Sequence, residues 1–172
     1  FDAAQPIAVA TTSGDVDFGV TAFTAGLYNL AGKGTLKVIG GMSRERKGYP
    51  LIGYFASNKA YAAGLTAPRD LAGKRVAVTQ VGSSFHYSLG LLADKYGFKL
   101  SDVKIVPLQS LSNAAAALKG ETVDAALLPV STARKLMDDG GAKLLGWVGD
   151  ETPWQLGAVF ASPTKRTTIS SI

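Results

Sequence analysis

Short apolar runs alternate along the chain with longer stretches in which apolar positions recur at helical spacing. The clearest example begins at 75–79, a β-branched run that predicts a strand. Apolar side chains then recur at spacings of four, three and four residues, as on one face of an α-helix: Phe85, Leu89, Leu92 and Tyr96. The pattern therefore predicts a strand, a tight turn and an amphipathic helix.

The turn between this strand and this helix contains Gly82, Ser83 and Ser84. Glycine suits the bend, and either serine can cap the helix, which Gly97 is placed to end. The start of a helix presents backbone N–H groups and about half a positive charge. The turn is therefore suited to a small anion or a strongly polar ligand.

The same order of elements is predicted at two other places. Residues 17–20 form a short buried strand, and Thr21 caps a helix that runs from Ala22 to about Ala31. Residues 124–128 form another buried strand, and Pro129–Thr132 open a helix through about Met137, with Pro129 at the first helical position.

The rest of the pattern supplies further strands and helices. Charged residues and glycines make 41–48 a predicted surface loop. The alternation predicts an α/β fold with one or two parallel, doubly wound sheets, in which ligands bind beyond the carboxyl ends of strands. Residues 3–13 fit either a strand or a short helix, and we favour the helix because Pro6 suits its first turn and Gly14 its end. The further elements are a helix at 113–118, helical turns within 58–70, and strands at 35–40, 50–56, 103–106, 143–147 and 158–161.

An internal similarity suggests two related halves. Residues 13–20 and 119–127 share a helix end, a glycine, an acidic residue, the pair Val-Asp and a buried strand. The copies lie too far apart for a solenoid repeat. They predict two similar α/β lobes that face each other across a cleft.

Composition narrows the function. The chain of 172 residues is 47% hydrophobic, enough for a substantial core, and has no apolar run of membrane-spanning length. It has no cysteine and one histidine, so we predict no metal site and no catalytic residues. The net charge of +5 is spread over single side chains, which predicts a solvated surface and no nucleic-acid partner.

Five blocks, in this order, cover most of the chain: 14–21, 70–78, 82–86, 101–106 and 115–125. They resemble the periplasmic solute-binding proteins of ABC importers, in the branch that handles nitrate, taurine, alkanesulfonates and thiamine precursors. The resemblance implies a two-lobed type II binding protein with mostly parallel sheets flanked by helices, truncated at both ends. It places 1–56 in the first lobe, 57–158 in the second and 159–172 in the first again, with crossings near 51–57 and 158–162.

The resemblance also implies a function. We expect a non-enzymatic monomer without a cofactor that captures a small organic anion (sulfonate, taurine, nitrate or carboxylate) in the interlobe cleft. It would deliver this ligand to an ABC permease. The implied location is the periplasm, or the outer side of the cytoplasmic membrane through a lipid anchor, with no membrane insertion of the chain itself.

Candidate ligand-binding residues lie at the three strand-to-helix turns, although each also has a purely structural interpretation as a cap or packing residue. Arg44 and Arg46 can reach an anion or simply be solvated. Trp147 and Trp154 can line a cleft or belong to the core. The ten candidates are Thr21, Ala22 and Phe23; Gly82, Ser83, Ser84 and Phe85; and Pro129, Val130 and Ser131.

Two other functions stay open. One is an enzyme on the same type of fold that acts on a pyrimidine precursor of thiamine, for which His86 is the reactive candidate, although no partner acid or nucleophile stands at a recognisable spacing. The other is an effector-sensing domain of a transcription regulator, which would require a helix-turn-helix before Phe1.

Overall fold

The computed structural model describes residues 4–163, which form two compact units. The chain passes from unit 1 to unit 2 after Arg44 and returns after Trp154. Unit 1 contains the described residues up to Arg44, the turn Gly82–Ser84 and the described residues from Gln155; unit 2 contains Glu45–Val81 and Phe85–Trp154.

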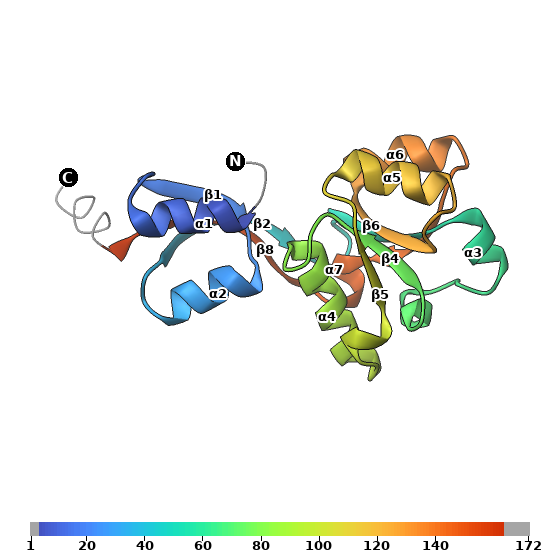
Figure 1. Ribbon diagram of the computed structural model, residues 1–172, viewed down its shortest axis with the longest axis horizontal. Coiled ribbons are helices and arrows are strands. Elements are labelled where there is room, and N and C mark those ends of the chain that lie inside the picture. The colour runs from blue at the N-terminus through green and yellow to red at the C-terminus, as the bar shows by residue number, and fades with distance from the viewer. Residues whose placement is uncertain (1–3, 164–172) are drawn as a thin grey trace. The chain divides into compact units, whose positions relative to one another are not determined.

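Unit 2 is built on a five-stranded sheet (Figure 1). Its strands, in spatial order, are β5 (Lys104–Pro107), β4 (Arg75–Val78), β6 (Ala125–Pro129), β3 (Ile52–Ala56) and β7 (Lys143–Trp147). β4 is parallel to β5 and β6, whereas β3 is antiparallel to β6 and β7. All five residues of β3 and the first four of β6 are buried, because apolar runs of this kind suit a sheet covered on both faces.

Helices cover both faces of this sheet. Neighbouring strand residues point to opposite faces, so Tyr54 and Phe55 identify the two layers. α5 (Leu111–Lys119) and α6 (Val130–Asp138) pack with Phe55 in one core cluster. On the other face, Tyr54 Oη donates to the Ser88 carbonyl oxygen of α4 (Ser84–Tyr96) at 3.2 Å. Short helical segments complete the unit: α3 (Asn58–Ala62), η1 (Pro68–Leu71), η2 (Leu100–Asp102) and α7 (Val148–Glu151).

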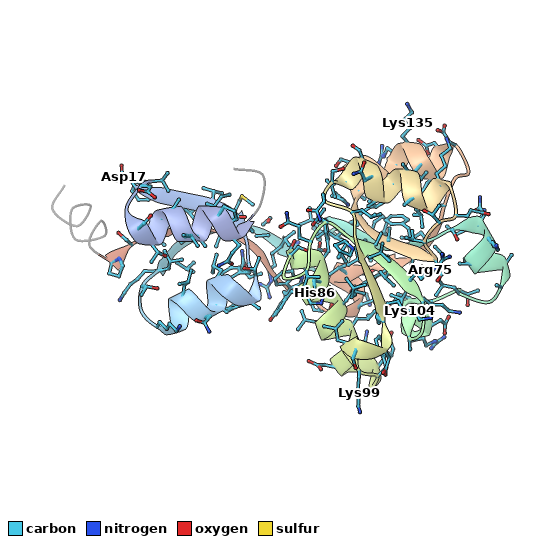
Figure 2. The ribbon with its side chains drawn as sticks, viewed as in Figure 1. Asp17, Arg75, His86, Lys99, Lys104 and Lys135 are labelled. Carbon is cyan, nitrogen blue, oxygen red and sulfur yellow. The ribbon has the colours of Figure 1, made fainter. Side chains whose placement is uncertain are left out.

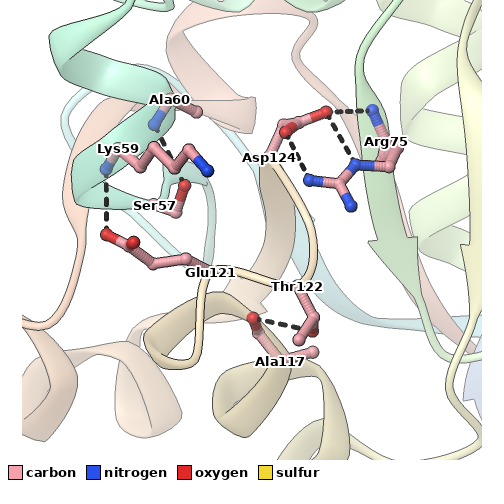
Figure 3. Close-up of polar contacts among 8 residues, drawn as sticks. All are labelled: Ser57, Lys59, Ala60, Arg75, Ala117, Glu121, Thr122 and Asp124. Carbon is pink, nitrogen blue, oxygen red and sulfur yellow. Dashed lines mark hydrogen bonds and ion pairs between the residues drawn. The ribbon is translucent and has the colours of Figure 1, made fainter.

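Side-chain hydrogen bonds hold the connection from α5 to β6 (Figure 3). The Glu121 carboxylate accepts from the Lys59 backbone N–H at the start of α3, at 3.0 Å. The Asp124 carboxylate accepts from the Arg75 backbone N–H at 2.8 Å and from its guanidinium at 2.9 and 3.2 Å. The hydrogen bond from Arg75 also lowers the pKa of Asp124. These contacts tie the start of β6 to the start of β4.

Unit 1 contains a three-stranded sheet in the order β1 (Phe18–Ala22), β8 (Trp154–Ala161) and β2 (Lys37–Glu45). α1 (Ala4–Ser13) packs along β1, and α2 (Ala25–Gly32) contacts α1 (Figure 1). A Cβ atom on Gly19 would lie 2.3 Å from the Phe160 ring and 2.7 Å from Thr11 Oγ1, so glycine permits the close approach of α1. On the opposite face, Phe18 and Val20 are 46% and 49% exposed.

The structure confirms most predicted elements and corrects two features. The strand at 17–20 is not buried, because β1 is an edge strand with a helix on one face only. The predicted loop 41–48 is wrong over 41–45, because β2 continues beside β8 to Glu45, and a turn between Arg46 and Tyr49 follows. The predicted lobe boundaries, after 56 and 158, stay a prediction; the compact units divide the chain after Arg44 and after Trp154, and β3 pairs inside the sheet of unit 2.

Candidate functional site

The turn before α4 lies between two elements of unit 2 but belongs to unit 1. Gly82 adopts φ +84°, a conformation that glycine accepts readily, and α4 begins at Ser84. Gly97, at φ +74°, ends the helix as predicted. Phe85 is 8% exposed and packs into unit 2, whereas Gly82–Ser84 group with unit 1. The predicted glycine, hydroxyl groups and helix start therefore lie together in one turn.

The far end of α4 is held by charged hydrogen bonds to α7. Glu151 Oε2 accepts from Lys95 Nζ and from Tyr96 Oη, both at 2.6 Å. Burial works against ionisation of Glu151, but the hydrogen bonds from Lys95 and Tyr96 outweigh it and lower the pKa of this carboxyl. Together with the bond from Tyr54 to Ser88, these contacts fix α4 behind its first turn.

The first predicted turn follows β1. Thr21 and Ala22 pair with Ala158 and Gly157 of β8, and the Phe23 backbone N–H donates to the Leu156 carbonyl oxygen at 2.8 Å. The Phe23 ring is 7% exposed and stacks on Tyr28 with centroids 4.9 Å apart. Phe23 therefore belongs to the packed interior of unit 1.

The prediction that Thr21 caps the following helix is wrong. Thr24 is the N-cap of α2, and its hydroxyl oxygen accepts from the Leu27 backbone N–H at 3.1 Å. Thr21 stays in the strand because pairing with β8 extends β1 to Ala22. The helix accordingly begins at Ala25, three residues later than predicted.

The third predicted turn is a direct junction of β6 with α6. Pro129 pairs with Ile52 and occupies the N-cap position, so the helix begins one residue later than predicted, at Val130. Pro129 makes no side-chain cap hydrogen bond. The Val130 backbone N–H donates to the Leu51 carbonyl oxygen at 2.8 Å. Ser131 is exposed in the first turn of α6.

The ten candidate residues fall into two sets. Thr21, Ala22 and Phe23 share unit 1 with Gly82, Ser83 and Ser84, whereas Phe85, Pro129, Val130 and Ser131 lie in unit 2. The turns after β4 and β6 leave the same edge of the sheet, because these strands are parallel neighbours. Helix starts and hydroxyl groups of this kind bind anions through N–H and O–H donors.

The arginines, tryptophans and histidine singled out in the sequence lie outside the three turns or pack against other side chains. Arg44 is exposed on β2, and the Arg46 guanidinium lies 3.8 Å from the centroid of the Tyr49 ring. Trp147 packs edge-on against Phe55 in the core of unit 2, with centroids 6.0 Å apart. Trp154 is 8% exposed and lies against Tyr87. His86 lies on the first turns of α4, and Figure 2 labels it there.

Glu45 is the residue that the sequence interpretation missed. It ends β2 and is completely buried. Burial raises the pKa of its carboxyl from the usual 4.5 to about 7. The signal was the order Arg44, Glu45, Arg46, since in a strand the middle residue faces away from its neighbours. The loop assignment concealed this alternation.

Two kinds of feature are absent from residues 4–163. No three histidine, cysteine, aspartate or glutamate side chains gather there as metal ligands would. None of the helices in the same range combines the length and the apolar character needed to cross a membrane.

Comparisons with known proteins agree with the fold. The family model described as NMT1/THI5 like matches residues 3–142. None of the curated proteins compared with the chain matches it. Among solved structures, the alkanesulfonate-binding protein SsuA from Xanthomonas axonopodis pv. citri, bound to MOPS, has 28% identity and a TM-score of 0.75 over 98% of this chain and 55% of that one.

Two further structures show the same fold. The periplasmic aliphatic sulphonate binding protein SsuA from Escherichia coli has 22% identity and a TM-score of 0.78, over 99% of this chain and 56% of that one. A putative periplasmic sulfonate-binding protein SsuA from Methylobacillus flagellatus KT has 23% identity and a TM-score of 0.70, over 95% and 47%. The chain spans about half the length of these proteins, and the predicted α/β fold class is confirmed.

Proposed function

The chain belongs to the NMT1/THI5-like family, and from this premise we propose that it acts as the solute-binding part of an ABC importer for a small organic anion. Sulfonates are the first ligand class to test, because the relative with 28% identity is an alkanesulfonate-binding protein. Taurine, nitrate and carboxylates remain members of the proposed ligand class. The proposed location is the periplasm, and the proposed partner is the permease.

The observation that carries this proposal is the position of Gly82–Ser84. This turn opens α4, a helix of 13 residues, and groups with the unit that holds Thr21–Phe23. The positive end of the helix dipole and the serine hydroxyl groups would bind the charged head of the ligand. Each hydrogen bond to a charged group contributes about 1.5–3 kcal/mol.

The remaining candidates take supporting roles in the proposal. Phe23 and Phe85 are 7% and 8% exposed. Their rings would therefore mainly support the two turns by packing beneath them, and only a small part of each ring would contact the ligand. The exposed Ser131 hydroxyl, at the start of α6, would add a donor from unit 2. We propose that the ligand is enclosed between the two units and that the protein works as a monomer.

A thermal-shift screen of the purified protein tests the proposal. The panel contains MOPS, short alkanesulfonates, taurine, nitrate, small carboxylates and a thiamine-precursor pyrimidine. A ligand at one hundred times its Kd stabilises a protein by about 2.7 kcal/mol, which raises Tm by several degrees. We expect a shift with at least one sulfonate.

Two variants locate the site. Ser84→Ala removes a hydroxyl group at the start of α4 and is expected to weaken binding about tenfold or more, measured by calorimetry. Ser101→Ala removes an exposed hydroxyl group in η2 and is expected to leave Kd unchanged. If the folded protein shows no thermal shift with any anion of the panel, the proposed function is wrong. If Ser84→Ala and Ser101→Ala weaken binding equally, the ligand does not bind at the start of α4.

A further inference from the structure

A buried carboxyl group stands where the chain enters unit 2. Glu45 is the last residue of β2 and the first residue of unit 2, and its side chain is 0% exposed. Neither of its carboxyl oxygens has a hydrogen-bond partner within residues 4–163. An ionised carboxylate in such surroundings is strongly disfavoured, because it has lost its hydration and gained no counter-charge.

Three backbone N–H groups lower the pKa of this carboxyl and partly offset its burial: those of Leu51 and Ile52, at the start of β3, and of Gly149, in α7. None of the three makes a hydrogen bond of good geometry to the carboxyl oxygens. The packing here is tight, because a Cβ atom on Gly149 would lie 2.6 Å from the Arg46 carbonyl oxygen. The segment that contains Glu45 and Arg46 therefore packs closely against the start of β3 and against α7.

The charged side chains on the surrounding elements are engaged elsewhere. Arg46 lies over the Tyr49 ring. On α7, Asp150 accepts from the Gly48 backbone N–H at 3.3 Å, and Glu151 binds Lys95 and Tyr96. Tyr54 of β3 is buried, and the negative charges of Glu151 and Glu45 add to burial in raising its pKa.

Two further polar atoms of unit 2 also lack a hydrogen-bond partner within residues 4–163. Thr152 Oγ1 and Trp154 Nε1 are buried and have no hydrogen-bond partner in the described part of the chain. Trp154 is the last residue of unit 2 before the chain returns to unit 1. Buried polar groups without a hydrogen-bond partner therefore occur in unit 2 where the chain enters it after Arg44 and where it leaves it after Trp154.

We propose that Glu45 is a proton-controlled anchor of the strand that enters unit 2. While the carboxyl is neutral, the segment of Glu45 and Arg46 stays packed against β3 and α7. When the carboxyl ionises, it draws water into this packing and loosens the segment.

The direction of the pH dependence follows from the two protonation states. Burial raises the pKa of Glu45 in the folded protein to about 7, against 4.5 for the ordinary group. Between these values the folded state holds a proton that the unfolded state releases, so stability falls as pH rises from about 4.5 to about 7. The packing of the Glu45 segment is thus most stable at acidic pH, where the carboxyl is neutral, and becomes less stable as the pH approaches 7.

Carbon-13 NMR of the whole protein, labelled at the glutamate side-chain carboxyl, tests the titration directly. The chain has three glutamates, so Glu45→Gln, Glu121→Gln and Glu151→Gln assign the three signals. If Glu45→Gln fails to fold, the other two variants assign its signal by elimination. We expect the Glu45 signal to titrate near pH 7, and a midpoint near 4.5 would overturn the proposal.

Hydrogen exchange tests the loosening itself. After correction for intrinsic rates, the amides of Leu51, Ile52 and Gly149 are expected to lose at least tenfold protection between pH 5.5 and 8 in the wild type. Glu45→Gln should keep its protection over this range, and the control Glu121→Gln should behave as the wild type does. Protection that does not change with pH in the wild type, or that falls equally in Glu45→Gln, would refute the anchor.

Discussion

The sheets of the two units share a sequence signature but differ in burial. Residues 13–20 and 119–127 each lead from a helix end into a strand, and both strands form as predicted. In unit 2, β6 lies in the middle of a sheet with helices on both faces, and its first four residues are buried. In unit 1, β1 lies at a sheet edge, and only Gly19 of its five residues is buried. The signature identifies the element, whereas the layers around it decide its burial.

This difference predicts an unequal division of stability. Burial of apolar surface contributes about 25 cal/mol per Å², so residues covered on both faces of a sheet contribute most. Fully buried large side chains of unit 2 include Tyr54, Phe55, Leu89, Leu127 and Leu128. Substitutions in unit 2 should therefore cost more than the same substitutions in unit 1.

The largest expected effect comes from two matched phenylalanines. Phe55→Ala, in β3, removes a ring that is 0% exposed, and we expect a loss of about 3–5 kcal/mol in the free energy of unfolding. Phe18→Ala, in β1, removes a ring that is 46% exposed, and we expect about 1 kcal/mol or less. Urea unfolding followed by circular dichroism measures both. Equal losses would show that unit 1 is packed as firmly as unit 2.

A smaller effect tests the one covered face of unit 1. Gly19→Ala places a methyl group 2.3 Å from the Phe160 ring, and we expect a loss of about 1–3 kcal/mol from overpacking. Gly40→Ala, in β2 of the same sheet, meets only the Val159 Cβ at 4.0 Å and is expected to be close to neutral. Both values come from the same urea experiment. A neutral Gly19→Ala would mean that α1 yields easily to the added methyl group.

The smallest effect separates two threonines three residues apart. Thr24→Ala removes the N-cap of α2 and should cost about 1 kcal/mol. Thr21→Ala changes a partly buried strand residue that caps nothing, and we expect at most about half as much. Thermal unfolding measures the pair. The reverse order would restore Thr21 as the cap and contradict the structure.

Much of the fold was predictable because local chemistry decides it. Glycines and hydroxyl residues between an apolar run and a helical pattern predicted the turn at Gly82–Ser84 and the end of α4 at Gly97. The choice between Thr21 and Thr24 as the cap was not predictable. It depends on how far β1 pairs with β8, and β8 lies more than one hundred residues away in the sequence.

The candidate site was predictable only in part. The glycine and hydroxyl residues at the predicted helix starts could be recognised in the sequence. The grouping of Gly82–Ser84 in one unit with Thr21–Phe23, in contrast, depends on tertiary contacts. Glu45 was hidden for a similar reason. The surrounding charges and glycines are typical of a loop, and only pairing beside β8 turns them into a strand with one inward-facing carboxyl.

The placement of the two tryptophans has a practical consequence for spectroscopy. Trp147 and Trp154 both belong to unit 2, and the chain has no other tryptophan. Intrinsic indole fluorescence therefore reports on one unit, while backbone signals average over both. A fluorescence transition that coincides with the backbone transition would show that the two units melt as one cooperative body. Separate transitions would assign the fluorescent one to unit 2 without any added label.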